Sequence, residues 1–398
     1  MDFRYTPEEQ QFRLEVRRFI AEHCPRELKG FHEIHAEHVP LEMAVLRKMA
    51  EKGWLGAAFP KEYGGLGGER VPMVEYILID ELHHADFEGI ALTVTYIIGI
   101  IGNTLLQAGS AELKREFLPR MLRAELRFAI AYSEPDSGND IASIRTQAVD
   151  DGDDFVITGQ KRFITCADTS DYMWTLVRSE RGSVRHKGLS IVLMKSNLPG
   201  ITIQVFEMMN GIQTCEVFLD AVRVPKRYLV GERGHGWQHL MEALARERMT
   251  MINFKAVSEP FERLVQWARS AEIDGQRVAD DPVARQSLAN MHVKIAGGKM
   301  LQLIAGARVA NKDYIPTLEA SACKMYRAML SWEKANLALD IMRAHGQLAE
   351  GSPGAPLEGW WAAEYGWAGH ELSGGGGMDL NRKIIAQQGL GLPRWSNH

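Results

Sequence analysis

Histidines and glycine-rich segments are the first residues whose spacing could support chemistry. His32, His35 and His38 recur at helical spacing and could bind a metal, but the acids between them and nearby lysines favour a solvated helix. The segment GERGHG (231–236) resembles a phosphate-binding glycine loop. It lacks a surrounding βαβ unit, so a turn into the next helix is the better interpretation. Neither pattern predicts a metal or nucleotide site by itself.

The cysteines give no sign of a disulfide framework or a metal cluster. No pair has metal-site or CxxC spacing, which favours reduced thiols and a cytoplasmic location. The four cysteines are Cys24, Cys166, Cys215 and Cys323. We therefore expect no metal centre.

Length and composition indicate an ordinary globular protein. The 398 residues allow two or three domains, and 45% apolar with 24% charged residues excludes a fibre or a disordered tail protein. The net charge of −5 provides no global basic field for nucleic acid. The first residues, MDFRYTPEEQQFRLEV, lack the apolar core of a secretory signal.

One uncharged segment, residues 89–111, is long enough to cross a bilayer. It contains threonines, an asparagine, a glutamine and several glycines, and it lies between amphipathic segments. We therefore interpret it as a buried helix that lines a pocket rather than as a membrane span. Thr95, Tyr96 and Ile98 are the candidates for the pocket wall.

Three regions differ in their periodicity. The first has helical spacing, and Thr6-Pro7-Glu8-Glu9 forms a capping box at its start. The second has short β-branched and aromatic runs separated by turn residues such as Asp151-Gly152, Thr158-Gly159 and Pro199-Gly200. The third returns to long helical patterns over 237–268, 283–311 and 317–344. We predict a helical domain (1–124), a β sandwich or barrel (125–235) and a helical bundle (236–398).

Four spaced motifs carry a resemblance that covers nearly the whole chain. They are AYSEPDSGNDIASIRTQA (131–148), VITGQKRFITCADTSDYMWTLVRS (156–179), EVFLDAVRVPKRYLVGERGHGW (216–237) and NRKIIAQQGLGLPR (381–394). In order and content they resemble the acyl-CoA dehydrogenase family. The resemblance implies a mainly α fold with a central β domain and a C-terminal four-helix bundle. It also implies FAD, an acyl-CoA thioester and electron transfer to an electron-transferring flavoprotein.

The resemblance assigns residues to the flavin and to coenzyme A. The backbone of Tyr132 and the hydroxyl of Ser133 match positions at the flavin pyrimidine edge, and Phe163 and Thr165 match residues beside N5. Such donors stabilise negative charge on the reduced ring. Asn139 stands where family members often carry a serine that contacts coenzyme A.

The catalytic base departs from the usual family pattern. Most members carry a glutamate before the last helix, but here Gly375 occupies that place within Ser373–Gly377. A minority branch, including isovaleryl- and long-chain-type enzymes, has the base on an earlier helix, where Glu247 and Arg248 match. Taken alone, Glu247 would be interpreted as a surface residue that forms an ordinary ion pair with a neighbouring arginine. The backbone N–H of Gly375 can still polarise the thioester carbonyl, so a buried Glu247 is the expected base.

The adenine side of the cofactor site also departs from the family. The usual arginine after the first C-terminal helix is absent from Ala271–Gly275, and two acids replace it. Arg343 could compensate, but Ala344 replaces a glycine that allows close approach. Two explanations stay open: an α2β2 heterotetramer whose related subunit completes the site, as in steroid side-chain enzymes, or a homotetramer with altered contacts.

The resemblance therefore predicts α,β-dehydrogenation of a long, branched or polycyclic acyl-CoA in fatty acid or steroid catabolism. Glu247 would remove the Cα proton while the Cβ hydride passes to flavin N5. A flavin-poor structural subunit and an acyl-CoA oxidase are the alternatives. We expect neither nucleic acid nor a membrane as a partner.

Overall fold

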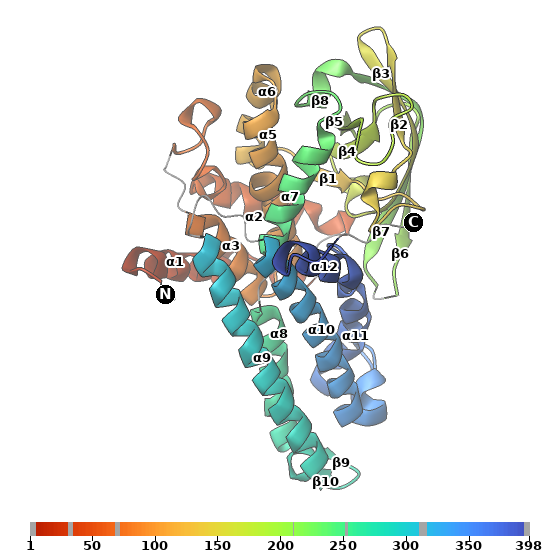
Figure 1. The fold of residues 1–398 in the computed structure, drawn as a ribbon. Coiled ribbons are helices and arrows are strands. Elements are labelled where there is room, and N and C mark those ends of the chain that lie inside the picture. The colour runs from red at the N-terminus through yellow and green to blue at the C-terminus, as the bar shows by residue number, and fades with distance from the viewer. Residues whose placement is uncertain are drawn as a thin grey trace. The chain divides into compact units, whose positions relative to one another are not determined.

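A computed structural model describes residues 5–30, 35–67, 72–209, 211–250, 254–309 and 317–393. The chain divides into two compact units. The first comprises residues 5–208 and 212–247, and the second comprises the residues from Arg248 onward with a short segment at Met209. The predicted order of helices, sheet and helices is confirmed (Figure 1). The predicted domain boundaries after residues 124 and 235 stay predictions.

Helices form the N-terminal half of the first unit. They are α1 (Pro7–His23), α2 (Val39–Glu51), α3 (Pro72–His84), α4 (Glu88–Val94), α5 (Gly102–Ala108) and α6 (Ala111–Leu122). The capping box at the start of α1 is confirmed, because Thr6 accepts the Glu9 N–H and Glu9 accepts the Thr6 N–H. Both bonds satisfy N–H groups that a helix start leaves unpaired.

The uncharged segment lies inside the helical core. It forms α4, a π-helical segment η6 (Thr95–Ile101) and α5. Glu88–Ala108 is apolar enough to span a membrane, yet 83% of its most apolar window is buried within the protein. Its burial supports the predicted core helix over a membrane span. Its role as a pocket wall stays a prediction. The π-helical turn widens the helix at the residues predicted to line the pocket.

One eight-stranded sheet follows the helices. The strands are β1 (Phe128–Ala131), β2 (Gln147–Asp151), β3 (Asp154–Ile164), β4 (Tyr172–Arg178), β5 (Leu189–Lys195), β6 (Ile201–Glu207), β7 (Gln213–Pro225) and β8 (Leu229–Val230). Their order is β6-β7-β3-β2-β4-β5-β8, and β1 pairs with β4 in parallel. A buried layer that includes Ile157, Val177, Val192 and Val217 packs on one face of this sheet.

The predicted turn at Thr158-Gly159 is wrong, because both residues lie within β3. The pairing of β3 with β7 shifts register between Ile157 and Gly159. A Cβ atom on Gly159 would lie only 2.4 Å from the Thr146 hydroxyl. Glycine therefore marks a bulge and a close approach here rather than a chain reversal.

The predicted helix over 237–268 is also wrong as one continuous element. It divides into α7 (Gly236–Thr250) and α8 (Lys255–Ser270). The second unit continues with the hairpin β9 (Glu272–Ile273) and β10 (Gln276–Arg277), followed by α9 (Pro282–Val309), α10 (Thr317–Met342), α11 (Trp360–Glu371) and α12 (Met378–Ile384). Phe254, Phe261 and Ile295 are among its buried core residues.

Candidate active site

The loop after β1 holds the first predicted flavin residues, Tyr132 and Ser133. Trp174 donates its indole N–H to the Tyr132 hydroxyl at 2.9 Å. Lys161 donates to the Tyr132 carbonyl at 3.1 Å, and the Arg162 N–H donates to the Ser133 carbonyl at 3.0 Å. The main chain predicted to meet the flavin edge is therefore fixed by β3 and β4.

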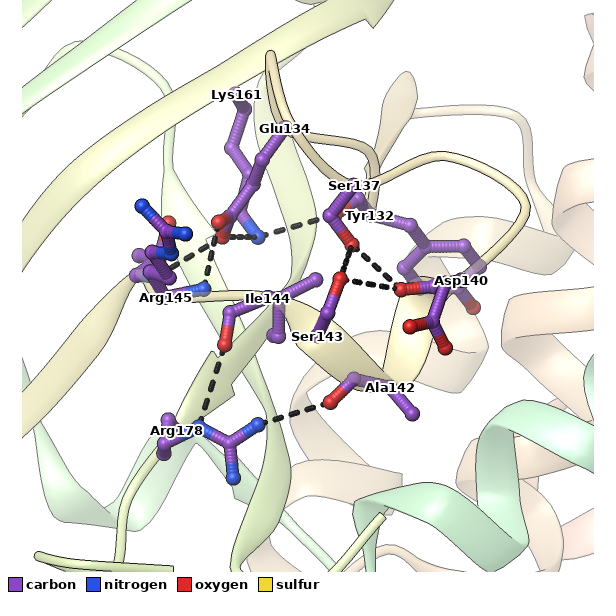
Figure 2. A network of polar contacts seen from close by, with 11 residues as sticks. Tyr132, Glu134, Ser137, Asp140, Ala142, Ser143, Ile144, Arg145, Lys161 and Arg178 are labelled. Carbon is purple, nitrogen blue, oxygen red and sulfur yellow. Dashed lines mark hydrogen bonds and ion pairs between the residues drawn. The ribbon is translucent and has the colours of Figure 1, made fainter. Parts of the chain in front are cut away.

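A buried ion pair supports this loop (Figure 2). Lys161 is fully buried and lies 2.9 Å from the Glu134 carboxylate. Glu134 also accepts the main-chain N–H groups of Arg145 at 2.6 Å and Thr146 at 2.9 Å. The pair therefore ties β3 to both ends of the loop between β1 and β2.

Burial affects the two charges of this pair unequally. It lowers the pKa of Lys161 to about 8, although Glu134 opposes the shift. Burial would raise the pKa of Glu134, but Lys161 and the N–H donors outweigh it and hold that pKa below its usual range. Both groups are thus charged at neutral pH.

The loop between β1 and β2 carries Asn139, the predicted coenzyme A contact, on its exposed side. Ser137 and Ser143 both donate to the Asp140 carbonyl, at 2.9 and 2.7 Å (Figure 2). The loop borders a cavity of about 240 Å³ whose walls include Glu134, Ser137, Ser143, Arg145 and Gln160. A cavity with several polar side chains in its walls therefore borders the loop that carries Asn139.

Arg178, at the end of β4, connects this loop to the loop between β4 and β5 through hydrogen bonds. Its guanidinium donates to the carbonyls of Ala142 at 3.0 Å and Ile144 at 3.2 Å (Figure 2). It also donates to the carbonyls of Arg185 at 3.0 Å and Lys187 at 2.9 Å in the β4–β5 loop. The planar fork of arginine suits such multiple bonding.

Phe163 lies near the end of β3 and Thr165 directly follows that strand; these are the residues predicted beside flavin N5. Phe163 has a positive φ of 61° and is 56% exposed. Its ring lies 5.8 Å from that of Phe206, and the Arg162 guanidinium lies 5.2 Å from its centre. A large exposed aromatic side chain beside a half-buried threonine fits a flat aromatic cofactor such as a flavin.

The predicted acyl-pocket residues lie on η6. Thr95 is buried and donates its hydroxyl to the Ala91 carbonyl at 2.8 Å, whereas Tyr96 is half-buried. Asn103 donates to the Ile98 carbonyl across the π-helical segment. The Thr95 hydroxyl is therefore hydrogen-bonded within its own helix, and Ile98 is buried. Tyr96 is the most accessible of the three candidates.

The predicted base and its neighbour are placed only by their backbone. Glu247 and Arg248 lie in the last turns of α7, and their side chains are outside the described residues. His32 is likewise outside the described residues. Within the described part of the chain, no group of three or more metal-binding side chains is present.

Gly375 lies in the connection between α11 and α12. It has a φ of +62°, and Gly376 has a φ of +87°. Side chains with a Cβ atom rarely adopt this conformation, so the connection suits glycine and disfavours a glutamate. The backbone thus agrees with the absence of the usual family base from this position.

Arg343 forms an ion pair with an acidic residue of the second unit. Its guanidinium lies 2.5 Å from the Asp274 carboxylate. Asp274 and Gly275 have φ values of 54° and 74° and form the tight turn between β9 and β10. Arg343 also borders a cavity of about 650 Å³ with Asn336, Asp340, Gln347 and Tyr365. Asp340 in the cavity wall and Asp274 on the Arg343 guanidinium make the cavity a poor site for a pyrophosphate.

The sequence prediction missed Glu134, Lys161 and Arg178 as supporting residues. Lys161 and Arg178 stand within the motif that carried the resemblance, in GQKRFIT and LVRS. Lys161 could have been predicted as a supporting residue from its place inside a strand. A buried lysine needs an acidic partner, so the pattern would have indicated an ion pair.

Comparisons with known proteins identify the class. Profiles of the acyl-CoA dehydrogenase N-terminal, middle and C-terminal domains match residues 6–125, 129–222 and 234–390. The chain therefore belongs to the acyl-CoA dehydrogenase family, whose members bind FAD. It is an oxidoreductase of the acyl-CoA dehydrogenase type.

Similar proteins include acyl-CoA dehydrogenases FadE26 and FadE29 of Mycobacterium tuberculosis. Both are 31% identical to this chain; FadE26 aligns over 99% of each chain and FadE29 over 98% of each. Two solved structures, the Tcur3481-Tcur3483 steroid ACAD and the ChsE4-ChsE5 complex from Mycobacterium tuberculosis, each share 30% identity and a TM-score of 0.85. Each match covers 99% of this chain and 100% of the other.

Proposed function

We propose that this protein catalyses the FAD-dependent α,β-dehydrogenation of an acyl-CoA thioester. The observation that carries the proposal is the contact of β3 with the loop after β1, in a chain of this family: Lys161 and Arg162 bind the carbonyls of Tyr132 and Ser133, and Phe163 and Thr165 follow directly along the chain. The FAD, when bound, accepts the hydride from Cβ. The chain supplies a base, donors for the thioester and a pocket for the acyl group.

Glu247 is the proposed base for the Cα proton, with Arg248 at the substrate side. The positive φ of Gly375 supports this assignment, because a glutamate at the usual family position would be strained. A carboxylate in an apolar pocket gains basicity toward a weak C–H acid. The Gly375 N–H is the proposed donor to the thioester carbonyl.

The proposed substrate is a long, branched or polycyclic acyl-CoA. The steroid ACAD among the similar structures supports the polycyclic choice. The apolar η6 helix, with Tyr96 half-buried, would form one wall of the acyl pocket, and Asn139 would contact coenzyme A. Electron-transferring flavoprotein is the proposed acceptor, and the cytoplasm is the proposed location.

The proposed assembly is an α2β2 heterotetramer with a related subunit. Arg343 would serve a pyrophosphate only after leaving Asp274, which favours an adenine site completed by another chain. The similar ChsE4-ChsE5 complex contains two named subunits, which agrees with this arrangement. Because Arg343 is already paired with Asp274, it is a poor ligand for FAD. Of the two alternative functions, the ion pair therefore favours a flavin-poor structural subunit over an acyl-CoA oxidase.

The test combines flavin content with turnover. The chain is purified alone and after co-expression with a related subunit, and the FAD-to-chain ratio and visible spectrum are recorded. We expect about one FAD for two chains only in the co-expressed complex, and bleaching at 450 nm when a steroid acyl-CoA is added without oxygen. One FAD per chain in the isolated protein would contradict the heteromer. A flavin that no acyl-CoA bleaches would contradict the dehydrogenase.

A further inference from the structure

A fully buried ion pair lies between two elements of the first unit, away from the loop of Figure 2. Glu42 on α2 has no exposed surface, and Arg127, directly before β1, is only 3% exposed. Their charged groups are 2.8 Å apart. Removing two charges from water is costly, so such a pair rarely adds stability over an apolar packing of the same volume. Its directional contacts are therefore its main contribution.

The contacts of Glu42 lead to the helix of the proposed acyl pocket. Thr93 on α4 donates its hydroxyl to the Glu42 carboxylate. Thr93 is also buried, and it comes two residues before Thr95, where the π-helical segment η6 begins. The carboxylate thus fixes the point at which α4 becomes η6.

The contacts of Arg127 lead to the turn of the proposed flavin site. Its guanidinium donates to the Thr169 hydroxyl and, at 3.4 Å, to the Cys166 sulfur. Its main-chain N–H donates to the Asp171 carboxylate at 2.8 Å, and Asp171 returns an N–H to the Arg127 carbonyl at 2.9 Å. Cys166 has a φ of 63° and directly follows Thr165. The arginine thus holds a turn whose backbone would otherwise be unfavourable.

We propose that Glu42 and Arg127 are positioning residues that fix the acyl-pocket helix relative to the flavin-side turn, and so set the alignment for hydride transfer. This inference rests on the proposed function. Neither residue touches the reacting atoms; each acts through Thr93 or through the turn of Cys166 and Thr169. Reaction rates depend steeply on such alignment, and a displacement of about 1 Å can cost about 10²-fold.

The sharpest single variant is Glu42→Gln, which keeps the shape and replaces the carboxylate that contacts Arg127. Glu81→Gln is its matched control. Glu81 is likewise buried in a helix of the same unit and held by arginines, Arg13 at 2.8 Å and Arg17 at 2.7 Å. Its arginines lie on α1 rather than on the flavin-side turn. A general effect of losing a buried carboxylate should appear in both variants.

The double variant Glu42→Leu with Arg127→Met separates positioning from stability. Replacing both charges by apolar side chains leaves neither partner as a lone buried ion, so the folded state should persist. We expect its melting temperature and FAD content to match those of the wild-type holoenzyme complex. The contacts to Thr93, Cys166 and Thr169 are nevertheless lost.

The readout is the rate of flavin reduction by acyl-CoA in a single anaerobic turnover, together with the Kd of the ester. We expect a 10- to 100-fold slower reduction in Glu42→Gln and in the double variant at about unchanged Kd, and a near wild-type rate in Glu81→Gln. Wild-type rates in the double variant, or equal losses in both glutamine variants, would overturn the positioning role. If the proposed function itself is wrong, the wild-type flavin is reduced by dithionite but not by any acyl-CoA.

Discussion

Arg343 and Asp274 form an ion pair of 2.5 Å in the second unit, at the place where the family resemblance puts the adenine side of the cofactor. The arginine that the sequence offered as a substitute phosphate ligand is thus already neutralised. The two side chains remain about half and three-quarters exposed. Solvent screens an exposed pair, so breaking it costs little stability.

The first prediction concerns this pair. Asp274→Ala releases Arg343 and removes a negative charge from the region, so the affinity for FAD should rise. An exposed pair is worth at most about 1 kcal/mol, which corresponds to about a fivefold change in Kd. Titration of the co-expressed complex with FAD after its flavin has been removed, followed by flavin fluorescence, measures the change.

Asp280→Ala is the matched control for that experiment. Asp280 pairs with Arg277 at 2.9 Å next to the same hairpin, and both side chains are exposed. This variant removes the same charge without releasing Arg343. Equal changes in the two variants would mean that net charge, rather than the freed arginine, governs FAD affinity.

The second prediction concerns the buried support of the flavin-side loop. Lys161→Met leaves the Glu134 carboxylate buried without its cation, so we expect a loss of about 3–5 kcal/mol in the free energy of unfolding. Urea denaturation measures it. Lys226→Met, which breaks a partly exposed pair with Asp150, should cost less than about 1 kcal/mol. Similar losses in both variants would refute a special role for the buried pair.

The third prediction is the acid sensitivity of the same site. The pKa of Glu134 is lower in the folded protein than its ordinary value of 4.5. The unfolded chain therefore binds the proton first as the pH falls. The stabilisation by Glu134 is complete above pH 4.5 and decreases as the pH falls through the lower, folded pKa. Urea midpoints between neutral pH and pH 3 should fall less steeply for Glu134→Gln than for the wild type; parallel curves would contradict this.

The fourth prediction concerns thiol reactivity. Burial raises the pKa values of Cys166, Cys215 and Cys323 to about 12, so their thiols stay protonated at pH 8. Cys24 is only half-buried. Iodoacetamide followed by mass spectrometry should label Cys24 in the native protein and all four cysteines in denaturant. Rapid native labelling of Cys166 would show that the turn after β3 opens readily.

Much of this architecture could be predicted from residue spacing. The capping box at Thr6 and the β-branched runs identified α1 and most strands, because these signals are local. Gly159 misled the prediction, since a glycine required by the approach of Thr146 looks the same in sequence as a turn glycine. The break between α7 and α8 left no proline or glycine to mark it.

The supporting contacts of the candidate site were harder to predict. Lys161 and Glu134 are 27 residues apart, and Glu42 and Arg127 come from different elements of the fold. Only the three-dimensional pairing shows that each buried charge has a partner. The Arg343–Asp274 pair shows the same difficulty, since both residues stood out in the sequence but their contact did not.

The most direct test of the central claim is single-turnover flavin reduction by an acyl-CoA in the Glu247→Gln holoenzyme. Loss of a general base should slow bleaching at 450 nm by about 10²–10⁴-fold with the flavin still bound. Glu242→Gln, on the same helix α7, should react at about the wild-type rate. Wild-type reduction by the Glu247→Gln enzyme would contradict the account.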